Sequence, residues 1–256
     1  MTDTVLVETR GRVRVITINR PEVRNAVDLA TAIALDDRFA EFEDDATVDV
    51  AVLTGAGGTF CSGADLKALA EDVADRVTLE GRGPMGPTRR RLTKPVIAAI
   101  EGYAVAGGLE LAIWCDLRVV ASGAIMGVFC RRLGVPLVDG GTIRLPRLIG
   151  ESRALDMILT GRGVGAAEAA EMGLANRVVP DGATLEEAIR LAAEITQAPQ
   201  TCLRNDRAST LSQWSHDEPD ALLAETRLGL ATIGSGETFA GAEAFVTGQG
   251  RHGATL

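Results

Sequence analysis

The clearest candidate for chemistry is Glu110, an acidic residue inside the longest apolar stretch of the chain, residues 96–116. A carboxyl group there is costly to desolvate unless a reaction uses it or a partner neutralises it. Gly107 and Gly108 precede it, and a glycine pair that leads into a helix presents open backbone N–H groups at the positive end of the helix dipole. The stretch therefore predicts an oxyanion-binding turn beside a carboxyl group. A structural glutamate paired with an arginine fits these residues equally well.

The elements around Glu110 repeat one pattern, in which a strand leads through a glycine-rich turn into a helix. Residues 48–54 are an apolar strand that runs into the glycine-rich turn 55–58 and then a loop that enters a short helix. Residues 96–100 are a second strand, followed by Gly107 and its helix. This repeat predicts an α/β fold with a parallel, helix-covered sheet whose loops gather at one edge, where ligands usually bind.

The other elements are predicted from the spacing of apolar residues and from the positions of glycine and proline. Residues 13–18 are β-branched and predict a strand, and apolar residues spaced by three and four predict a helix at 29–42 that Asp28 caps. Residues 71–92 carry glycines and prolines without a period and predict a mobile segment. Beyond residue 140 we expect helices at 150–159, 166–172, 185–195, 201–211, 219–232 and 237–247, and a short strand at 177–179.

Pro199 marks a boundary between two predicted domains, a core at 1–198 and a helical region at 199–256. The apolar positions of the helical region suit packing against another subunit.

Composition excludes several classes of protein. The chain has 256 residues, 46% of them hydrophobic, and a net charge of −9, which argues against a general binder of nucleic acid or of membrane surfaces. No apolar run reaches membrane-spanning length without interruption, and the first residues do not resemble a secretory signal, so we expect a cytoplasmic protein. The four cysteines have no metal-like spacing, which predicts neither a disulfide framework nor a metal site.

Five segments, taken in order, resemble the crotonase, or enoyl-CoA hydratase/isomerase, superfamily. They cover most of residues 13–180. These segments are Asn19-Arg20-Pro21 with Asn25-Ala26, LTGAGGTFCSGADLK at 53–67, KPVIAAIEGYAVAGGLELAIWCDLRV at 94–119, LPRLIG at 145–150 and LTGRGVGAAEAAEMGLANRVVP at 159–180. A single glycine motif is weak evidence, but this ordered set is highly specific.

The resemblance implies a crotonase-type spiral of ββα units with a C-terminal helical trimerisation region, in a homotrimer or a hexamer formed as a dimer of trimers. It implies acyl-coenzyme A thioesters as substrates and an oxyanion hole made by the backbone N–H groups of Ala64 and Gly107. Two such donors would hold the thioester oxygen as it gains enolate charge. No metal or organic cofactor is expected, because the thioester itself acidifies the Cα proton.

By the same resemblance, Glu110 aligns with the first of the two catalytic glutamates of hydratases. The second glutamate is lost, since Cys130 stands twenty residues on, where hydratases have a Pro-Glu pair. A thiol with an unperturbed pKa near ~8.5 is a poor general acid for water chemistry. We therefore interpret Cys130 as an inert, buried thiol.

Asp139 is the candidate for a replacement acid. Typical hydratases have a Pro-Gly-x-Gly-Gly turn here, whereas several isomerase-like and dehalogenase-like members carry an aspartate that faces the substrate. The alternative is an aspartate that caps the helix expected to begin near Thr142. We favour the catalytic interpretation, because two carboxyls from different loops allow one to remove a proton while the other delivers one.

For coenzyme A, the resemblance places basic residues near the nucleotide and backbone groups against the adenine and pantetheine. The basic candidates can equally be ordinary surface charges. The residues at these positions are Arg24, Ser62, Ala64, Asp65, Leu66 and Lys67.

The predicted function is enoyl-CoA hydration and dehydration, or double-bond isomerisation, in fatty-acid or related acyl-CoA metabolism. The sequence leaves two alternatives open. One is a thioester hydrolase or decarboxylase. The other is a non-catalytic acyl-CoA-binding homologue that kept the pocket and lost the chemistry with its second glutamate.

Overall fold

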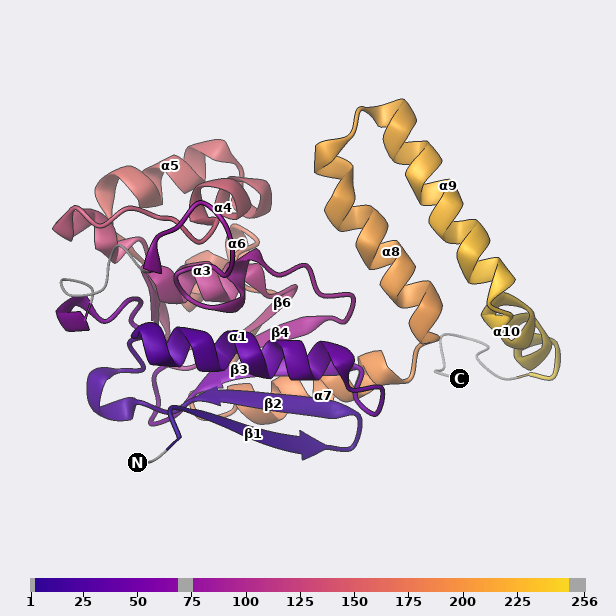
Figure 1. The fold of residues 1–256 in the computed structure, drawn as a ribbon, viewed down its shortest axis with the longest axis horizontal. Helices are drawn as coiled ribbons and strands as arrows, with labels where there is room; N and C mark the ends of the chain where they lie inside the picture. Colours follow the sequence, from indigo (N-terminus) through magenta and orange to yellow (C-terminus); the bar gives the residue numbers. More distant parts are fainter. Residues whose placement is uncertain (1–2, 69–75, 249–256) are drawn as a thin grey trace. The chain divides into compact units, whose positions relative to one another are not determined.

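The computed structural model describes residues 3–68 and 76–248. The chain forms two compact units, the first ending at Ala192 and the second beginning at Ala193. Both units are coloured along the sequence in Figure 1. The predicted boundary, between residues 198 and 199, lies a few residues later, just before helix α8 (Gln200–Ser212).

The first unit contains a six-stranded sheet in the order β1-β2-β3-β4-β6-β9. From β2 onwards all neighbouring strands are parallel, as the sequence predicted. Strands β3 and β4 are buried almost throughout, which matches their continuous apolar sequences. The strands are β1 (Val5–Arg10), β2 (Val13–Ile18), β3 (Val50–Gly55), β4 (Val96–Ile100), β6 (Leu117–Ala121) and β9 (Arg177–Val179).

Strand β1 departs from the predicted parallel pattern. It pairs antiparallel with β2 in register from Val5 opposite Ile18 to Arg10 opposite Val13, and Gly11 takes φ +60° in the tight connection between them. Most of β1 is exposed, so it lacks the pattern of buried apolar residues by which a strand is predicted from sequence.

A second, three-stranded sheet in the order β5-β7-β8 was not predicted. Each strand has only three residues, too few for an alternating pattern to show. The strands are β5 (Tyr103–Val105), β7 (Ile125–Gly127) and β8 (Gly163–Gly165). This small sheet matters for function, because β5 delivers the chain to the helix that carries Glu110.

Helices flank the sheets of the first unit, and most begin where the sequence predicted them. Figure 1 shows α1 lying along the strands β1 to β4. Asp28 caps α1 by accepting a hydrogen bond from the backbone N–H of Thr31, as predicted. The helices are α1 (Leu29–Asp44), α3 (Gly107–Trp114), α4 (Gly141–Ile149), α5 (Glu151–Thr160), α6 (Ala166–Glu171) and α7 (Thr184–Thr196).

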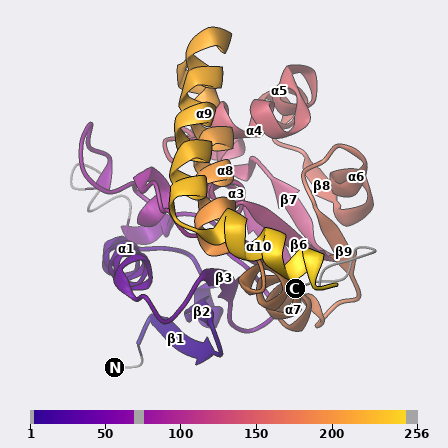
Figure 2. The ribbon, with the colours of Figure 1, turned by 90° about the vertical axis from the view of Figure 1, so that its right-hand side faces the viewer.

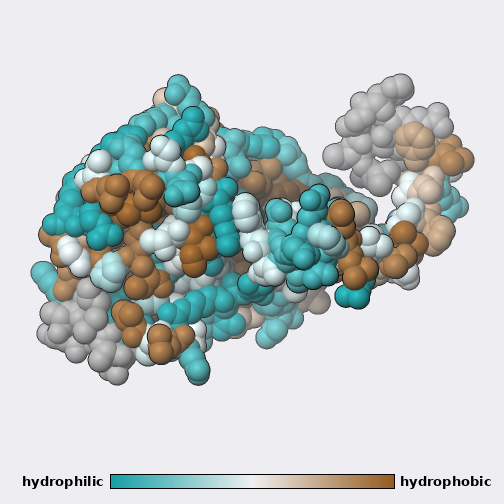
Figure 3. All heavy atoms as spheres, turned by 90° about the horizontal axis from the view of Figure 1, so that it is seen from above, coloured by the Kyte–Doolittle hydropathy of each residue, from teal (hydrophilic) through white to brown (hydrophobic). Residues whose placement is uncertain are grey.

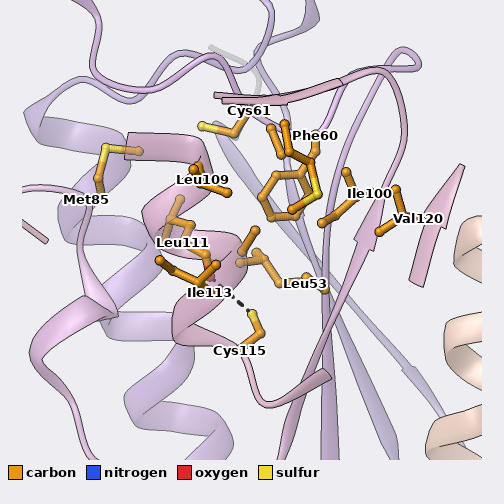
Figure 4. Close-up of a cluster of buried hydrophobic side chains, with 14 of the residues drawn as sticks. Leu53, Phe60, Cys61, Met85, Ile100, Leu109, Leu111, Ile113, Cys115 and Val120 are labelled. Atoms are coloured by element: carbon orange, nitrogen blue, oxygen red, sulfur yellow. Dashed lines mark hydrogen bonds between the residues drawn. The ribbon is translucent and has the colours of Figure 1, made fainter. Parts of the chain in front are cut away.

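The core of the first unit lies between α3, α1 and the six-stranded sheet. Figure 4 draws Leu109, Leu111 and Ile113 of α3 in one cluster of buried side chains with Leu53 and Ile100 of the sheet. All five side chains are at most 4% exposed. Burial on this scale stabilises the fold by roughly 25 cal/mol for each Å² of apolar surface removed from water, and it fixes α3 against the sheet.

The second unit is helical, with α8, α9 (Glu218–Gly234) and α10 (Glu237–Val246). Helices α8 and α9 run side by side (Figures 1 and 2), and Asn205 of α8 donates a hydrogen bond to the Thr232 hydroxyl of α9. Large apolar side chains nevertheless remain on the surface, among the brown patches of Figure 3. The most exposed are Leu222, Leu230, Phe239, Phe245, Val246 and Trp214.

Candidate active site

The loop that follows the first predicted glycine turn and the glycine turn at Gly107 both line a cavity of about 260 Å³ in the first unit. Its lining includes residues of the loop at 62–66, the start of α3, and Phe129 with residues that follow it. The carboxyl-bearing residues Glu110 and Asp139 both line it. Side chains from segments far apart in sequence therefore converge on one space, which is mainly apolar apart from the two acids, Arg76 and Ser62.

The predicted oxyanion hole is consistent with the geometry of the turns. Ala64 and Gly107 both line the cavity, and among the described residues neither backbone N–H has a hydrogen-bond partner. The two turns touch, because a Cβ placed on Gly63 would lie only 3.0 Å from the backbone nitrogen of Gly107. Two unused donors thus lie at the start of two helical segments and beside one cavity.

Each turn is held in place by backbone hydrogen bonds. Val27 donates to the carbonyl of Gly63 at 2.8 Å, and Ala106 donates to the carbonyl of Gly127 at 2.9 Å. Ala106 has φ +55°, a conformation that an alanine adopts only at some cost in backbone strain. The fold stabilises this bend, which turns the chain from β5 into α3 and leaves the next amide open.

Glu110 is buried, with 2% of its surface exposed, and it forms no ion pair with any described residue. Its Oε1 accepts hydrogen bonds from the backbone N–H groups of Asp139 at 2.9 Å and Gly141 at 2.8 Å. The structural alternative, a glutamate neutralised by an arginine, is therefore wrong for the described chain. Burial, and secondly the charge of Asp139, raises the pKa of Glu110 to about 7, although the amide hydrogen bonds oppose this rise.

Asp139 is also buried, with 3% of its surface exposed. Its Oδ1 accepts hydrogen bonds from the backbone N–H of Met85, at 2.9 Å, and from the hydroxyl of Thr88. Burial raises the pKa of Asp139 above its ordinary value, and the hydrogen bonds from Thr88 and Met85 oppose that rise. The helix-cap alternative is wrong, since α4 begins at Gly141 after a left-handed Gly140 and has no side-chain cap.

Cys130 lies where the family resemblance places the second glutamate of hydratases, and it does line the cavity. It sits in a short 3-10 helix, Phe129–Leu133, and is 7% exposed. Burial, and secondly the charge of Glu110, raises the pKa of the Cys130 thiol. A protonated thiol is a weak nucleophile, in keeping with the inert interpretation.

The residues predicted to bind coenzyme A gather around one loop, but they do different things there. Ser62, Ala64 and Leu66 line the cavity, and the backbone N–H of Ser62 donates to the carbonyl of Arg24 at 3.1 Å. The side chains of Arg24 and Lys67 are exposed.

Asp65 has a structural partner. Its carboxylate accepts a hydrogen bond from Arg20 at 3.1 Å and another from the backbone N–H of Lys67 at 3.2 Å. Its backbone N–H donates to the carbonyl of Val27 at 2.8 Å. Asp65 therefore holds the loop in shape through both its side chain and its amide.

The segment predicted to be mobile, residues 71–92, falls partly outside the described residues. The prediction does not anticipate residues 83–88, all of which are buried. Within them, Met85 and Thr88 supply the hydrogen bonds to Asp139, and Met85 lies beside the start of α3 in Figure 4. Nothing in the local sequence distinguishes these two residues, because their partner is more than fifty positions away.

A buried guanidinium was also missed. Arg76 is 3% exposed, lines the cavity, and donates hydrogen bonds to the carbonyls of Val27 at 2.9 Å and Pro84 at 3.3 Å. Its charge contributes to lowering the pKa of Asp139 against the effect of burial.

Residues 3–68 and 76–248 contain neither a group of three or more metal-ligating side chains nor a helix long and apolar enough to cross a membrane.

Comparisons with known proteins agree with this geometry. The enoyl-CoA hydratase/isomerase family model matches residues 8–249. The chain is 37% identical over 251 residues to enoyl-CoA hydratase EchA19 of Mycobacterium tuberculosis, covering 94% of this chain and 92% of the relative. The crystal structure of enoyl-CoA hydratase EchA1 from Mycobacterium marinum superimposes with a TM-score of 0.90 at 38% identity, covering 95% of this chain and 96% of that one.

A probable enoyl-CoA hydratase/isomerase from Mycobacterium abscessus is similar to the same extent, with a TM-score of 0.88, 38% identity and 96% of each chain covered. The family match spans both units, and the similarity extends over nearly the whole length of each relative. The chain therefore belongs to the enoyl-CoA hydratase/isomerase family of the crotonase superfamily, and it is an enzyme of that family.

Proposed function

We propose that this enzyme acts on acyl-CoA thioesters through an enolate, and that Glu110 and Asp139 move the protons. The observation that carries the proposal is the convergence of two unused backbone N–H groups, Ala64 and Gly107, with two buried carboxyls on one cavity. The amides would stabilise the negative charge that develops on the thioester oxygen. Loss of one such donor typically costs about 3 kcal/mol of transition-state stabilisation.

In hydration of a 2-enoyl-CoA, ionised Glu110 removes a proton from water, whose oxygen adds to Cβ. The electron pair of the double bond moves towards the thioester oxygen, and protonated Asp139 then delivers a proton to Cα. The pKa of Glu110, about 7, suits this role because the group exchanges protons readily near neutral pH. Dehydration is the reverse.

The same pair would support double-bond isomerisation, in which one carboxyl removes a proton from Cα or Cγ and a proton is returned at the other carbon. The presence of Cys130 in place of a second glutamate favours this variant of the chemistry. Hydrolysis of the thioester and decarboxylation remain distinguishable by their products, free coenzyme A and carbon dioxide.

Coenzyme A would enter along the loop that carries Ser62 and Leu66, with main-chain groups of residues 62–66 against the adenine and pantetheine. The exposed side chains of Arg24 and Lys67 would contact its phosphates. The exposed apolar side chains of α9 and α10 support a homotrimer, or a dimer of trimers, in which they are covered. Sedimentation analysis tests the assembly.

The decisive experiment is exchange of the Cα proton. The enzyme is incubated in D₂O with a saturated acyl-CoA, and with 2-enoyl-CoA and 3-enoyl-CoA thioesters of several chain lengths. We expect deuterium at Cα together with hydration or isomerisation of the unsaturated substrates. Hydration should be lost in Glu110→Gln, and exchange at Cα should be lost in Asp139→Asn. Tight binding without any exchange would show instead an acyl-CoA-binding homologue that lacks catalysis.

A further inference from the structure

The carboxylate of Asp139 is oriented from one side by a single turn, residues 83–88. Both described hydrogen bonds to its side chain come from this turn, from the Met85 N–H and the Thr88 hydroxyl, and both end on Oδ1. Oδ2 is therefore the oxygen left to face the cavity that Asp139 lines. The turn is closed by two hydrogen bonds between the backbones of Gly83 and Gly86, at 3.0 and 2.8 Å.

The turn is built to leave room for the Thr88 hydroxyl. A Cβ on Gly83 would overlap that hydroxyl oxygen and would lie 2.7 Å from Oδ1 of Asp139. Only glycine at position 83 lets the hydroxyl and the carboxylate meet.

Arg144 joins the same two residues a second time. Its guanidinium donates one hydrogen bond to the carbonyl of Asp139 and another to the carbonyl of Thr88, both at 2.7 Å. Thr88 and Asp139 are thus held together through their side chains and, by way of Arg144, through their main chains. The backbone N–H of Asp139 in turn donates to Glu110, so the arrangement reaches both acids.

We propose that Thr88 is a positioning residue for the reaction: its hydroxyl, seated over Gly83 and fixed by Arg144, holds Oδ1 of Asp139 and thereby directs Oδ2 at the acyl group. This inference rests on the proposed function for its catalytic meaning. Its physical content does not: the Thr88 hydroxyl is hydrogen-bonded to Oδ1 and orients the carboxyl group of Asp139.

The test compares three variants of the full chain. Thr88→Val removes the hydroxyl at nearly constant shape, and Thr88→Ser retains it. Thr93→Val is the matched control, because the Thr93 hydroxyl also donates to a carboxylate, that of Glu43, at an exposed site outside the cavity.

For Thr88→Val we expect kcat to fall about ten-fold with KM within about two-fold, since the hydrogen bond that orients Asp139 is lost while the binding surface is kept. Its pH–rate profile should show the Asp139 ionisation moved to higher pH, because the lost donor favoured the charged form. Thr88→Ser and Thr93→Val should match the wild type in both measurements. If Thr88 had only a structural role, serine would not restore activity, and the pKa of Asp139 would not be the only one to shift.

A second measurement needs no substrate. The aspartate carboxyls are labelled with ¹³C for NMR, and the Asp139 signal is assigned with Asp139→Asn. The Asp139 carboxyl should titrate at higher pH in Thr88→Val than in the wild type. If the wild type turns over acyl-CoA but Thr88→Val matches it in rate and titration, the positioning inference is overturned and the proposed function stands. If the wild type is inactive on every thioester, the proposed function fails, and an unchanged Asp139 titration overturns the inference as well.

Discussion

The two acids of the site are held in opposite ways. Glu110 projects from a helix into main-chain amides, those of Asp139 and Gly141, whereas Asp139 projects from a loop onto a turn that offers one amide and one hydroxyl. Backbone N–H donors are retained when the side chains around them are substituted. The environment of Glu110 is therefore a property of the fold, and that of Asp139 can be tuned by changing one side chain.

Replacing Glu110 tests the half of the site that the main chain holds. Glutamine retains an oxygen that can accept both amides, so Glu110→Gln should leave the loop in place and remove only proton transfer. We expect kcat to fall about a thousand-fold, within the range typical of a lost general base or acid. Steady-state kinetics with a 2-enoyl-CoA measures this.

Glu101→Gln is the matched control for that substitution. Glu101 also accepts main-chain hydrogen bonds, from Gly182 and Thr184, and it does not line the cavity. A similar loss of activity in both variants would show that the effect comes from disturbing loops rather than from removing the proton carrier.

Asp139→Asn tests the half that a side chain holds. Asparagine can still accept from Met85 and Thr88, so we expect a loss of about a hundred-fold in kcat from the missing acid. The charge of Asp139 helps to raise the pKa of Glu110, so its removal should lower that pKa and shift the corresponding limb of the pH–rate profile to lower pH. If that limb of the pH–rate profile does not shift, the charge of Asp139 has no effect on the pKa of Glu110.

The burial of Glu110 should also be visible in stability. Its pKa in the folded protein is about 7, against an ordinary 4.5, so the folded state binds this proton more tightly than the unfolded chain does. The stabilisation is fully present below pH 4.5 and is lost as pH rises through about 7, with a difference of up to about 3 kcal/mol.

Urea unfolding of the wild type and Glu110→Gln at pH 5 and pH 8 measures this difference. The free energy of unfolding of Glu110→Gln, relative to that of the wild type, should be higher at pH 8 than at pH 5. Equal pH dependence of the two proteins would mean that Glu110 is better solvated than its position indicates.

Cys130 should matter least. It lines the cavity, but burial and the charge of Glu110 keep its thiol protonated. Cys130→Ser should keep kcat/KM within about three-fold of the wild type, and iodoacetamide should inactivate the wild type only slowly at neutral pH. Rapid alkylation protected by acyl-CoA would instead make the thiol part of the reaction.

Much of the site could be predicted from local sequence. Glu110 stands out because a carboxyl in an apolar run is costly, and Gly107 because a helix begins there after a strand. The parallel strands β3 and β4 follow from continuous apolar residues, and α1 follows from its spacing and its Asp28 cap. These signals need only neighbours within a few positions.

The contacts that define Asp139 could not be read in this way. Thr88 and Asp139 are 51 residues apart, and the segment around Thr88 has the composition of a loop. The family resemblance favoured a catalytic Asp139, but its position before α4 left a capping role as the alternative. The short strands β5, β7 and β8 were missed for a similar reason, since three residues carry no period.

By itself, the sequence determined the family, the order and type of most elements, and the presence of one buried carboxyl beside a glycine turn, because burial patterns and turn residues are local properties of the chain. Only the tertiary structure decided which oxygen of Asp139 is held by hydrogen bonds. It depends on a hydroxyl, an amide and a guanidinium that come from segments distant in sequence. No local sequence pattern predicts that these groups are in contact.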